Sequence, residues 1–211
     1  TGLFAAYGGD ALIACHSIRK HPAAALAALG VVFQQSSLDL DLSVERNLRF
    51  HAALHGLPHA LANERIEQGC TALGLANDRQ RAVRELSGGN RRKVELVRAL
   101  LHRPAVLLMD EASVGLDPAS RRDLLAALRA DIAARNTTVL WATHLVEEAV
   151  QADRVLVLHQ GKLIADGTPP EVTIALSGSA AFLSLGMSVI ALGIGNIVDR
   201  LDAGPRREIV D

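Results

Sequence analysis

The sequence predicts an α/β fold in which a mostly parallel sheet carries a helical insertion. Four short runs are continuously apolar, which is typical of parallel strands covered on both faces. These runs are residues 31–33, 106–109, 139–142 and 155–158. Helical patterns lie between them, and strands that alternate with helices along a chain indicate this fold class.

The first apolar run is followed by a long stretch without strand character. Residues 42–84 read as two helices, with apolar residues at helical spacing and a break at Gly56-Leu57-Pro58. A third helix is expected over residues 89–102, where Pro104 would stop it. Together these helices predict an insertion over about residues 42–100 of the α/β domain.

The helix between the second and third apolar runs has the strongest local signals. Asp117 is a favourable N-cap, and Pro118 fits the first helical position. Asn136 is expected to end this helix. Its inward face is predicted to carry Leu124, Leu125, Leu128 and Ile132.

Composition excludes several classes of protein. Of 211 residues, 49% are hydrophobic and 21% charged, which excludes a disordered chain. The net charge is −1, so nucleic acid is not expected as the main partner, because phosphate binding needs a basic face. Cys15 and Cys70 lie far apart and form no zinc or redox motif, which indicates a reducing, cytoplasmic compartment.

The tail differs from the rest of the chain. Residues 172–198 contain no Asp, Glu, Lys or Arg, and such a length could span a bilayer, although Gly, Ser and Asn dilute it. Three interpretations stay open: a membrane segment, a buried pair of helices, or an artefact of cloning or reading frame. We therefore separate residues 1–172, the α/β domain, from residues 173–211, an apolar tail.

Two adjacent carboxylates follow the second apolar run. Asp110 at a strand end can hold Mg²⁺, and Glu111 after it can orient or deprotonate an attacking water. An acidic loop before a helix would show the same two residues. The pair on its own therefore indicates catalysis no more strongly than it indicates a surface loop.

A glycine pair before a helix predicts an anion site. Ser87, Gly88 and Gly89 combine a hydroxyl with a backbone that a ligand can approach closely, in front of free helix amides. The alternative is an ordinary helix start capped by Ser87.

Two further polar residues follow apolar runs. His144 could contact a phosphate oxygen, although a lone histidine is more often structural, and Gln34 alone is an uninformative loop residue. However, Gln34, Asp110, Glu111 and His144 would all lie at the carboxyl edge of one parallel sheet, where α/β proteins bind ligands. With the glycine anion site, they supply the parts of a nucleotide triphosphatase.

These motifs, in this order, resemble the ATP-binding subunits of ABC transporters over about residues 1–172. The matches are Gln34 with the Q-loop, residues 86–90 with the signature motif, 106–111 with Walker B, Asp117 with the D-loop, His144 with the switch histidine and 153–169 with the closing hairpin. The resemblance implies a P-loop NTPase-like fold that binds ATP and Mg²⁺. The resemblance also implies a role for each of these residues. Those implied to be catalytic are Glu111, His144 and Gln34. Those implied to bind ATP are Ser87, Gly88, Gly89 and Asp117, and those implied to bind the metal are Asp110 and Gln34.

The sequence departs from this family in three places. Ala112-Ser113 stands where Pro-Thr is usual, and Asn90 replaces the usual Gln. No Gly-x-x-x-x-Gly-Lys-Ser/Thr motif occurs, and Thr1-Gly2-Leu3-Phe4 resembles the end of the helix that follows it in the family. We therefore expect the sequence to begin just after the phosphate loop. We also expect weak MgATP binding and exposed strand edges where a central strand would be missing.

The resemblance implies a function in transport. We expect an ATPase subunit of an exporter, paired head to tail with a second ATP-binding domain. It would contact a membrane permease through the segment after Gln34, residues 35–42, at the cytoplasmic face of the inner or plasma membrane. A soluble ABC-type ATPase that acts on DNA or ribosomes would carry the same motifs. A third possibility is a binding module without independent ATPase activity.

Overall fold

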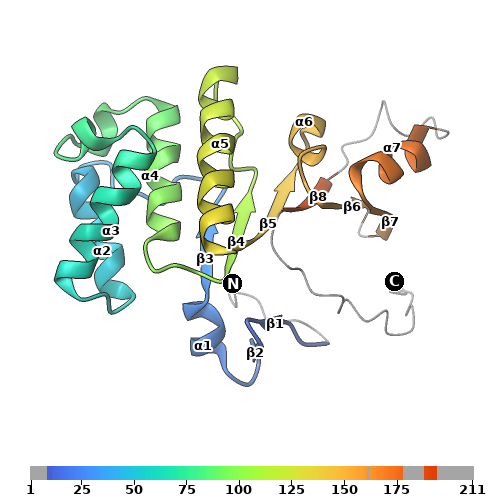
Figure 1. Ribbon diagram of the computed structural model, residues 1–211, viewed down its shortest axis with the longest axis horizontal. Coiled ribbons are helices and arrows are strands. Elements are labelled where there is room, and N and C mark those ends of the chain that lie inside the picture. Colours follow the sequence, from blue (N-terminus) through green and yellow to red (C-terminus); the bar gives the residue numbers. More distant parts are fainter. Residues whose placement is uncertain (1–8, 161, 178–187, 194–211) are drawn as a thin grey trace.

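The computed structural model describes residues 9–160, 162–177 and 188–193 (Figure 1). The strands are β1 (Leu12–Ile13), β2 (His16–Ser17), β3 (Leu29–Val32), β4 (Val106–Asp110), β5 (Thr138–Thr143), β6 (Arg154–His159), β7 (Lys162–Gly167) and β8 (Ser188–Gly193). The α-helices are α1 (Pro22–Ala27), α2 (Val44–Leu54), α3 (His59–Ala72), α4 (Gly88–Leu100), α5 (Pro118–Arg135), α6 (Val146–Ala149) and α7 (Pro169–Ser177). Two short 3-10 helices, η1 (Ala76–Asp78) and η2 (Val83–Glu85), join α3 to α4.

One six-stranded sheet organises the fold, with the strand order β3-β4-β5-β8-β6-β7. β3, β4 and β5 pair in parallel, so their carboxyl ends share one edge. β6 and β7 form an antiparallel hairpin in which Arg154 donates two hydrogen bonds to the carboxylate of Asp166, at 2.7 and 2.8 Å. The α/β fold, the four predicted strands and the closing hairpin are therefore confirmed.

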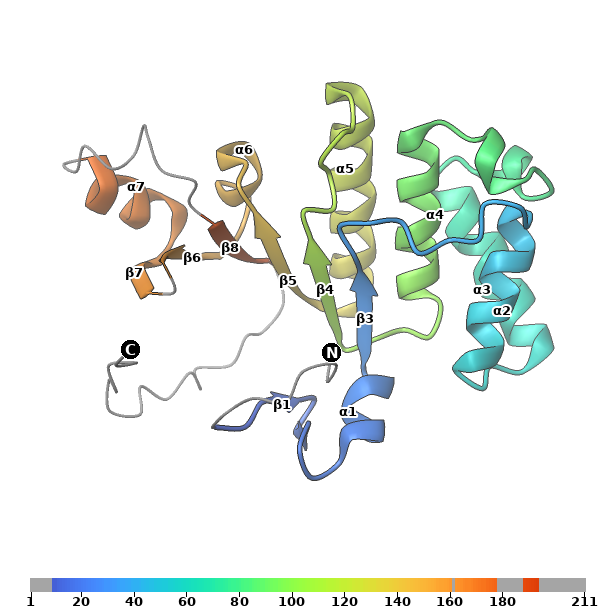
Figure 2. The same cartoon turned by 180° about the vertical axis from the view of Figure 1, so that it is seen from behind.

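The prediction that the parallel strands are covered on both faces is wrong for the part of the chain that the structure describes. α4 and α5 lie against one face of β3–β5, and no described helix covers the other (Figures 1 and 2). Burial alternates accordingly: Leu107 and Met109 are buried, whereas Leu108 between them is only half-buried. Continuous apolar character alone could not reveal which face is covered.

β8 was not predicted from the sequence. It pairs antiparallel with both β5 and β6. The expectation of exposed strand edges is therefore wrong for the facing edges of these two strands. The pairing also shows that a pair of helices is the wrong interpretation for Ser188–Gly193. The other residues of the tail after Ser177 lie outside the described part of the chain.

No helix among the described residues is long enough and apolar enough to cross a membrane.

The helical insertion forms as predicted. α2 and α3 are separate helices, and Leu48, Ala52, Ile66 and Cys70 point into the main core. Leu54, the last residue of α2, is exposed. The surrounding apolar packing raises the pKa of the Cys70 thiol to about 11, so this cysteine is an unreactive core residue.

α4 connects the insertion to the sheet. Its backbone approaches β3 so closely that a Cβ on Gly30 would lie 2.5 Å from the carbonyl oxygen of Ala99, which explains the glycine there. α4 and α5 both begin at the end of the sheet where the parallel strands terminate (Figure 2). Asp117 caps α5, and Asn136 ends it in a left-handed conformation (φ 55°), both as predicted.

Candidate functional site

The carboxylate of Glu111 lies between two polar side chains at the carboxyl edge of the parallel strands. Gln34, which follows β3, donates from Nε2 to Glu111 Oε2 at 2.7 Å. His144, which follows β5, places Nδ1 3.1 Å from Glu111 Oε1. Because a carboxylate only accepts hydrogen bonds, Nδ1 of His144 carries the proton in this arrangement. The structure thus brings Gln34 and His144, two of the three residues that we predicted as catalytic, into direct contact with the third, Glu111.

The backbone turns sharply at Glu111. Its φ of 44° lies in the left-handed region, which is rare for a residue other than glycine, and its amide donates to Ala142 at 2.9 Å. This turn directs the chain away from β4 and leaves the neighbouring Asp110 exposed at the strand end. The two carboxylates are therefore both accessible at the edge.

The predicted anion site adjoins the start of α5. Ser87 caps α4, and its hydroxyl accepts from the Asn90 amide at 3.2 Å. A Cβ on Gly89 would lie 2.8 Å from Ser120 Oγ, whereas Gly88 has open space around its Cα. Asp117 accepts from the Ser120 hydroxyl at 2.6 Å. That hydroxyl, followed by backbone amides, lowers the pKa of the Asp117 carboxyl, which keeps it ionised.

These residues form two groups rather than one. Gln34 and His144 each contact Glu111, and Asp110 precedes Glu111 in the chain. Gly89 and Asp117 both lie against Ser120, at the cap formed by Ser87. No hydrogen bond among the described residues joins the two groups directly.

Arg92 is a buried connection that sequence reasoning missed. Arg92 lies on α4. Its guanidinium donates hydrogen bonds to the carbonyl oxygens of Phe33 (2.6 Å), Glu111 (3.3 Å) and Ala112, and it forms an ion pair with Glu95. It therefore fixes the backbone immediately before Gln34 and at Glu111. The only signal in the sequence was the position of Arg92, a basic residue about one turn into the helix. Nothing nearby in the sequence identifies the partners of its guanidinium.

α4 also holds the segment that follows Gln34. Glu95 accepts from the Ser37 amide at 3.1 Å, and Arg98 donates to the carbonyl oxygen (2.9 Å) and hydroxyl (2.6 Å) of Ser37. The helix that begins at Ser87 is thus tied to the Gln34 segment at three successive positions on one face.

A second buried carboxylate, that of Glu148, links the segments that follow β4 and β5. Glu148 accepts hydrogen bonds from the hydroxyls of Ser113 and Thr143. These contacts join the loop after Glu111 to the residue before His144. The acidic residue four positions after His144 was the only signal in the sequence.

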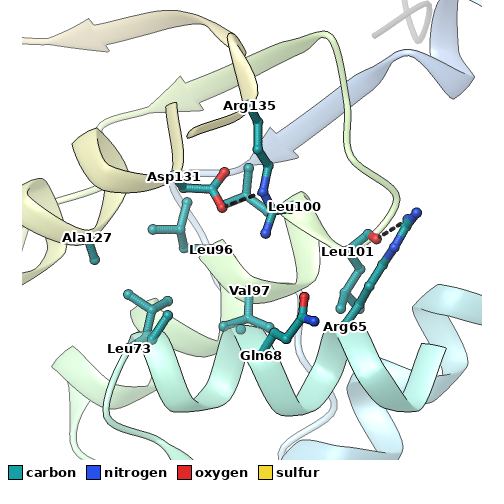
Figure 3. Close-up of a pocket in the computed structure, with 12 residues that line it drawn as sticks. Arg65, Gln68, Leu73, Leu96, Val97, Leu100, Leu101, Ala127, Asp131 and Arg135 are labelled. Carbon is teal, nitrogen blue, oxygen red and sulfur yellow. Dashed lines mark hydrogen bonds and ion pairs between the residues drawn. The ribbon is translucent and has the colours of Figure 1, made fainter. Parts of the chain in front are cut away.

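A small cavity lies away from these residues, between α3, α4 and α5 (Figure 3). Its volume is about 60 Å³, and Leu73, Leu96 and Val97 line it together with the Asp131–Arg135 ion pair. This volume is far too small for a nucleotide, and the cavity contains none of the predicted site residues.

Residues 1–114 match the protein family described as ABC transporter. The chain belongs to this family. Its arrangement of Gln34, Glu111 and His144 at one sheet edge is thus found in a member of the ABC transporter family, and its α/β fold agrees with solved ABC structures. One of these is cbiO1 of Clostridium perfringens, described as part of the ABC transporter complex cbiONQ. It has a TM-score of 0.74 and 26% identity, over 82% of this chain and 71% of that one.

Curated ABC proteins are also similar. A probable multidrug ABC transporter ATP-binding protein of Escherichia coli is 34% identical over 81% of this chain and 29% of its own length. A daunorubicin/doxorubicin resistance ATP-binding protein of Streptomyces peucetius is 34% identical over 84% of this chain and 54% of its own. An energy-coupling factor transporter ATP-binding protein of Symbiobacterium thermophilum is 38% identical, over 68% and 50%. The chain spans about half or less of the length of these relatives.

Proposed function

We propose that this chain is the ATP-binding and ATP-hydrolysing part of an ABC exporter. The observation that carries the proposal is the Glu111 carboxylate, held between Gln34 and His144 at the carboxyl edge of a parallel sheet. That edge is where α/β proteins bind ligands, and both helix N-termini nearby can receive phosphate.

In this proposal Glu111 is the general base. Its two oxygens are oriented by Gln34 and His144, so one lone pair on each stays available to accept a proton from water. The second ring nitrogen of His144, Nε2, would donate to a phosphate oxygen when the imidazole carries a proton on both nitrogens. The buried Arg92 and Glu148 are positioning residues, because they hold the backbone on either side of Glu111 and His144.

The oxygen donors at this edge suit a hard cation. Asp110 has an exposed carboxylate, and Gln34 keeps its amide oxygen free because its nitrogen faces Glu111. These two residues would hold Mg²⁺, which neutralises charge on the phosphates when it is bound. Ser87, Gly88 and Gly89 would contact the phosphates of ATP held by a second domain, with Asp117 at the same contact.

The partners follow from the same arrangement. A second ATP-binding domain, in a homodimer or pseudodimer, would complete the site. A membrane permease would bind the helical insertion at the cytoplasmic face of the inner or plasma membrane. Exposed apolar side chains support this contact: Leu40 follows the Gln34 segment, and Phe50 and Leu54 project from α2. The net charge of −1 supports a protein partner rather than nucleic acid.

Export is favoured over import by the names of similar proteins. Two of the three described above are named for multidrug transport or drug resistance.

The test is ATP hydrolysis by Glu111→Gln in an ATP-hydrolysing form of the protein. Loss of a general base lowers turnover by about 10²–10⁴-fold, and nucleotide binding should persist. The matched control is Glu67→Gln, an exposed residue of α3, which should leave turnover unchanged. Unchanged phosphate release by the Glu111→Gln variant would refute the assignment.

A further inference from the structure

Three histidines lie close together near the carboxyl end of α4, at the opposite end from its Ser87 cap. His51 lies in the last turn of α2, His55 is the C-cap residue that follows this helix, and His102 follows the carboxyl end of α4. One ring nitrogen from each lies within 4.8 Å of the others. The rings of His55 and His102 are stacked with centroids 3.8 Å apart, and His51 is tilted against His55 at 4.7 Å.

The hydrogen bonding of His102 leaves one nitrogen ready to bind a ligand. Its Nε2 lies 3.1 Å from the carbonyl oxygen of Leu29, so Nε2 carries the proton and Nδ1 keeps a lone pair. His102 Nδ1 and His51 Nε2 are buried, and neither has a hydrogen-bond partner among the described residues. Buried polar atoms are normally paired, so these two call for an explanation. Histidines that bind metals usually donate their other nitrogen to a carbonyl or carboxylate, as His102 does.

The surroundings keep the cluster uncharged near neutral pH. Burial lowers the pKa of His51 and of His102 to about 4 and also lowers that of His55. The cations that face the cluster act in the same direction: Arg98 on His51, and Arg65 on His102. Neutral imidazole is the form that binds metals. The same two arginines repel an added cation, so the affinity should be moderate rather than extreme.

We propose that His51, His55 and His102 form a binding site for Zn²⁺, with water as the fourth ligand. Three imidazoles and an open fourth position suit tetrahedral zinc. Binding requires the stacked His55 ring to rotate, and its half-exposed position at the C-cap of α2 permits this movement. Because His102 is anchored to Leu29, the metal would clamp the helical insertion to the first residue of β3.

Calorimetric titration of the full chain with Zn²⁺, together with absorption spectra with Co²⁺, tests this site. We expect about one equivalent bound and a tetrahedral cobalt spectrum without a thiolate charge-transfer band. His55→Asn and His102→Asn should each weaken binding by about tenfold or more. The matched control is His21→Asn, which removes an exposed histidine that makes no side-chain capping bond to α1.

Several outcomes would overturn the proposal. Wild-type affinity in both cluster variants would show that the metal binds elsewhere. A thiolate band would assign binding to the exposed Cys15, and loss of binding in His144→Asn alone would assign it to the sheet edge. Circular dichroism of each variant separates lost binding from lost folding. The half-exposed His55 variant should keep the wild-type spectrum even if the His102 variant does not.

Discussion

Gln34 donates a hydrogen bond to Glu111 over 2.7 Å, although 77 residues separate them in the chain. The contact arises because β3 and β4 are parallel neighbours, which brings the residues that follow them to one edge. The amide of Gln34 can approach the carboxylate because its Nε2 donates a hydrogen bond and carries no negative charge. This relationship makes the chemistry of position 34 testable.

Gln34→Glu should lower ATP turnover at neutral pH by at least about tenfold. The substitution would place two carboxylates in contact, and one of them would then hold a proton to higher pH, which removes the free base. Turnover should recover as pH rises. A pH–rate profile in an ATP-hydrolysing form measures this. The control is Gln35→Glu, an exposed neighbour, whose profile should match the wild type; a Gln34→Glu profile with no shift would contradict the proposed base.

Ser87→Arg should abolish ATP-dependent dimerisation without unfolding the domain. A bulky cation at position 87 would occupy the open space next to Gly88, where the phosphate is proposed to bind. Gel filtration with ATP, in a form blocked in hydrolysis, measures the dimer. Ser87→Ala is the comparison variant: it removes the cap and the hydroxyl without adding bulk or charge, and it should cost about 0.5–2 kcal/mol of stability. An undiminished dimer in Ser87→Arg would exclude contact with phosphate across the interface.

Arg92→Met should destabilise the fold by roughly 3–5 kcal/mol, because it leaves Glu95 buried and unpaired. The double variant Arg92→Met/Glu95→Leu should lose less than the sum of the single losses. Urea unfolding measures both. The control is Arg84→Met, whose ion pair with Asp41 is largely exposed and should be worth less than about 1 kcal/mol. Equal losses in the two arginine variants would contradict a buried network.

Stability should fall as pH drops from about 6.5 to 4. Burial lowers the pKa of His51 and of His102 to about 4, whereas unfolded histidine titrates near 6.5. In this window the unfolded chain binds protons that the folded chain excludes, so acid favours unfolding. Each ring is partly exposed, so we expect about 1 kcal/mol from each. Urea midpoints across this range, without added metal, should depend less on pH in the His51→Asn variant than in the wild type or in His21→Asn.

The 211 residues alone should bind MgATP very weakly. The sequence contains no phosphate-loop motif, whose amides and lysine supply hydrogen bonds to the phosphates. Charge-assisted hydrogen bonds are worth roughly 1.5–3 kcal/mol each, and about 1.4 kcal/mol changes affinity tenfold. Calorimetric titration measures this. Micromolar binding would show that another segment supplies the phosphate contacts.

Local signals explain what the sequence predicted well. Asp117 and Pro118 start a helix through their own side chains, and Asn136 ends it, so these bounds needed no knowledge of the fold. Gln34, Glu111 and His144 were correctly expected near one another because each follows a strand of a parallel sheet. That inference depends on topology but not on detailed packing.

Long-range contacts explain what the sequence could not predict. Arg92 binds carbonyl oxygens, and every residue has one, so its partners leave no trace in the residue types around it. β8 owes its place to pairing with β5 and β6 rather than to any pattern in its own glycine-containing run. The covered face of β3–β5 likewise depends on where α4 and α5 pack.

α4 joins the two proposed binding regions in a single rigid element. Its 13 residues span about 20 Å, with the Ser87 cap at one end and His102 just beyond the other. If zinc at the histidines alters how the capped end meets a second domain, thermodynamic reciprocity applies. Dimer formation must then change zinc affinity by the same factor. A metal titration performed with and without the dimer would therefore measure the coupling free energy between the two ends of this helix.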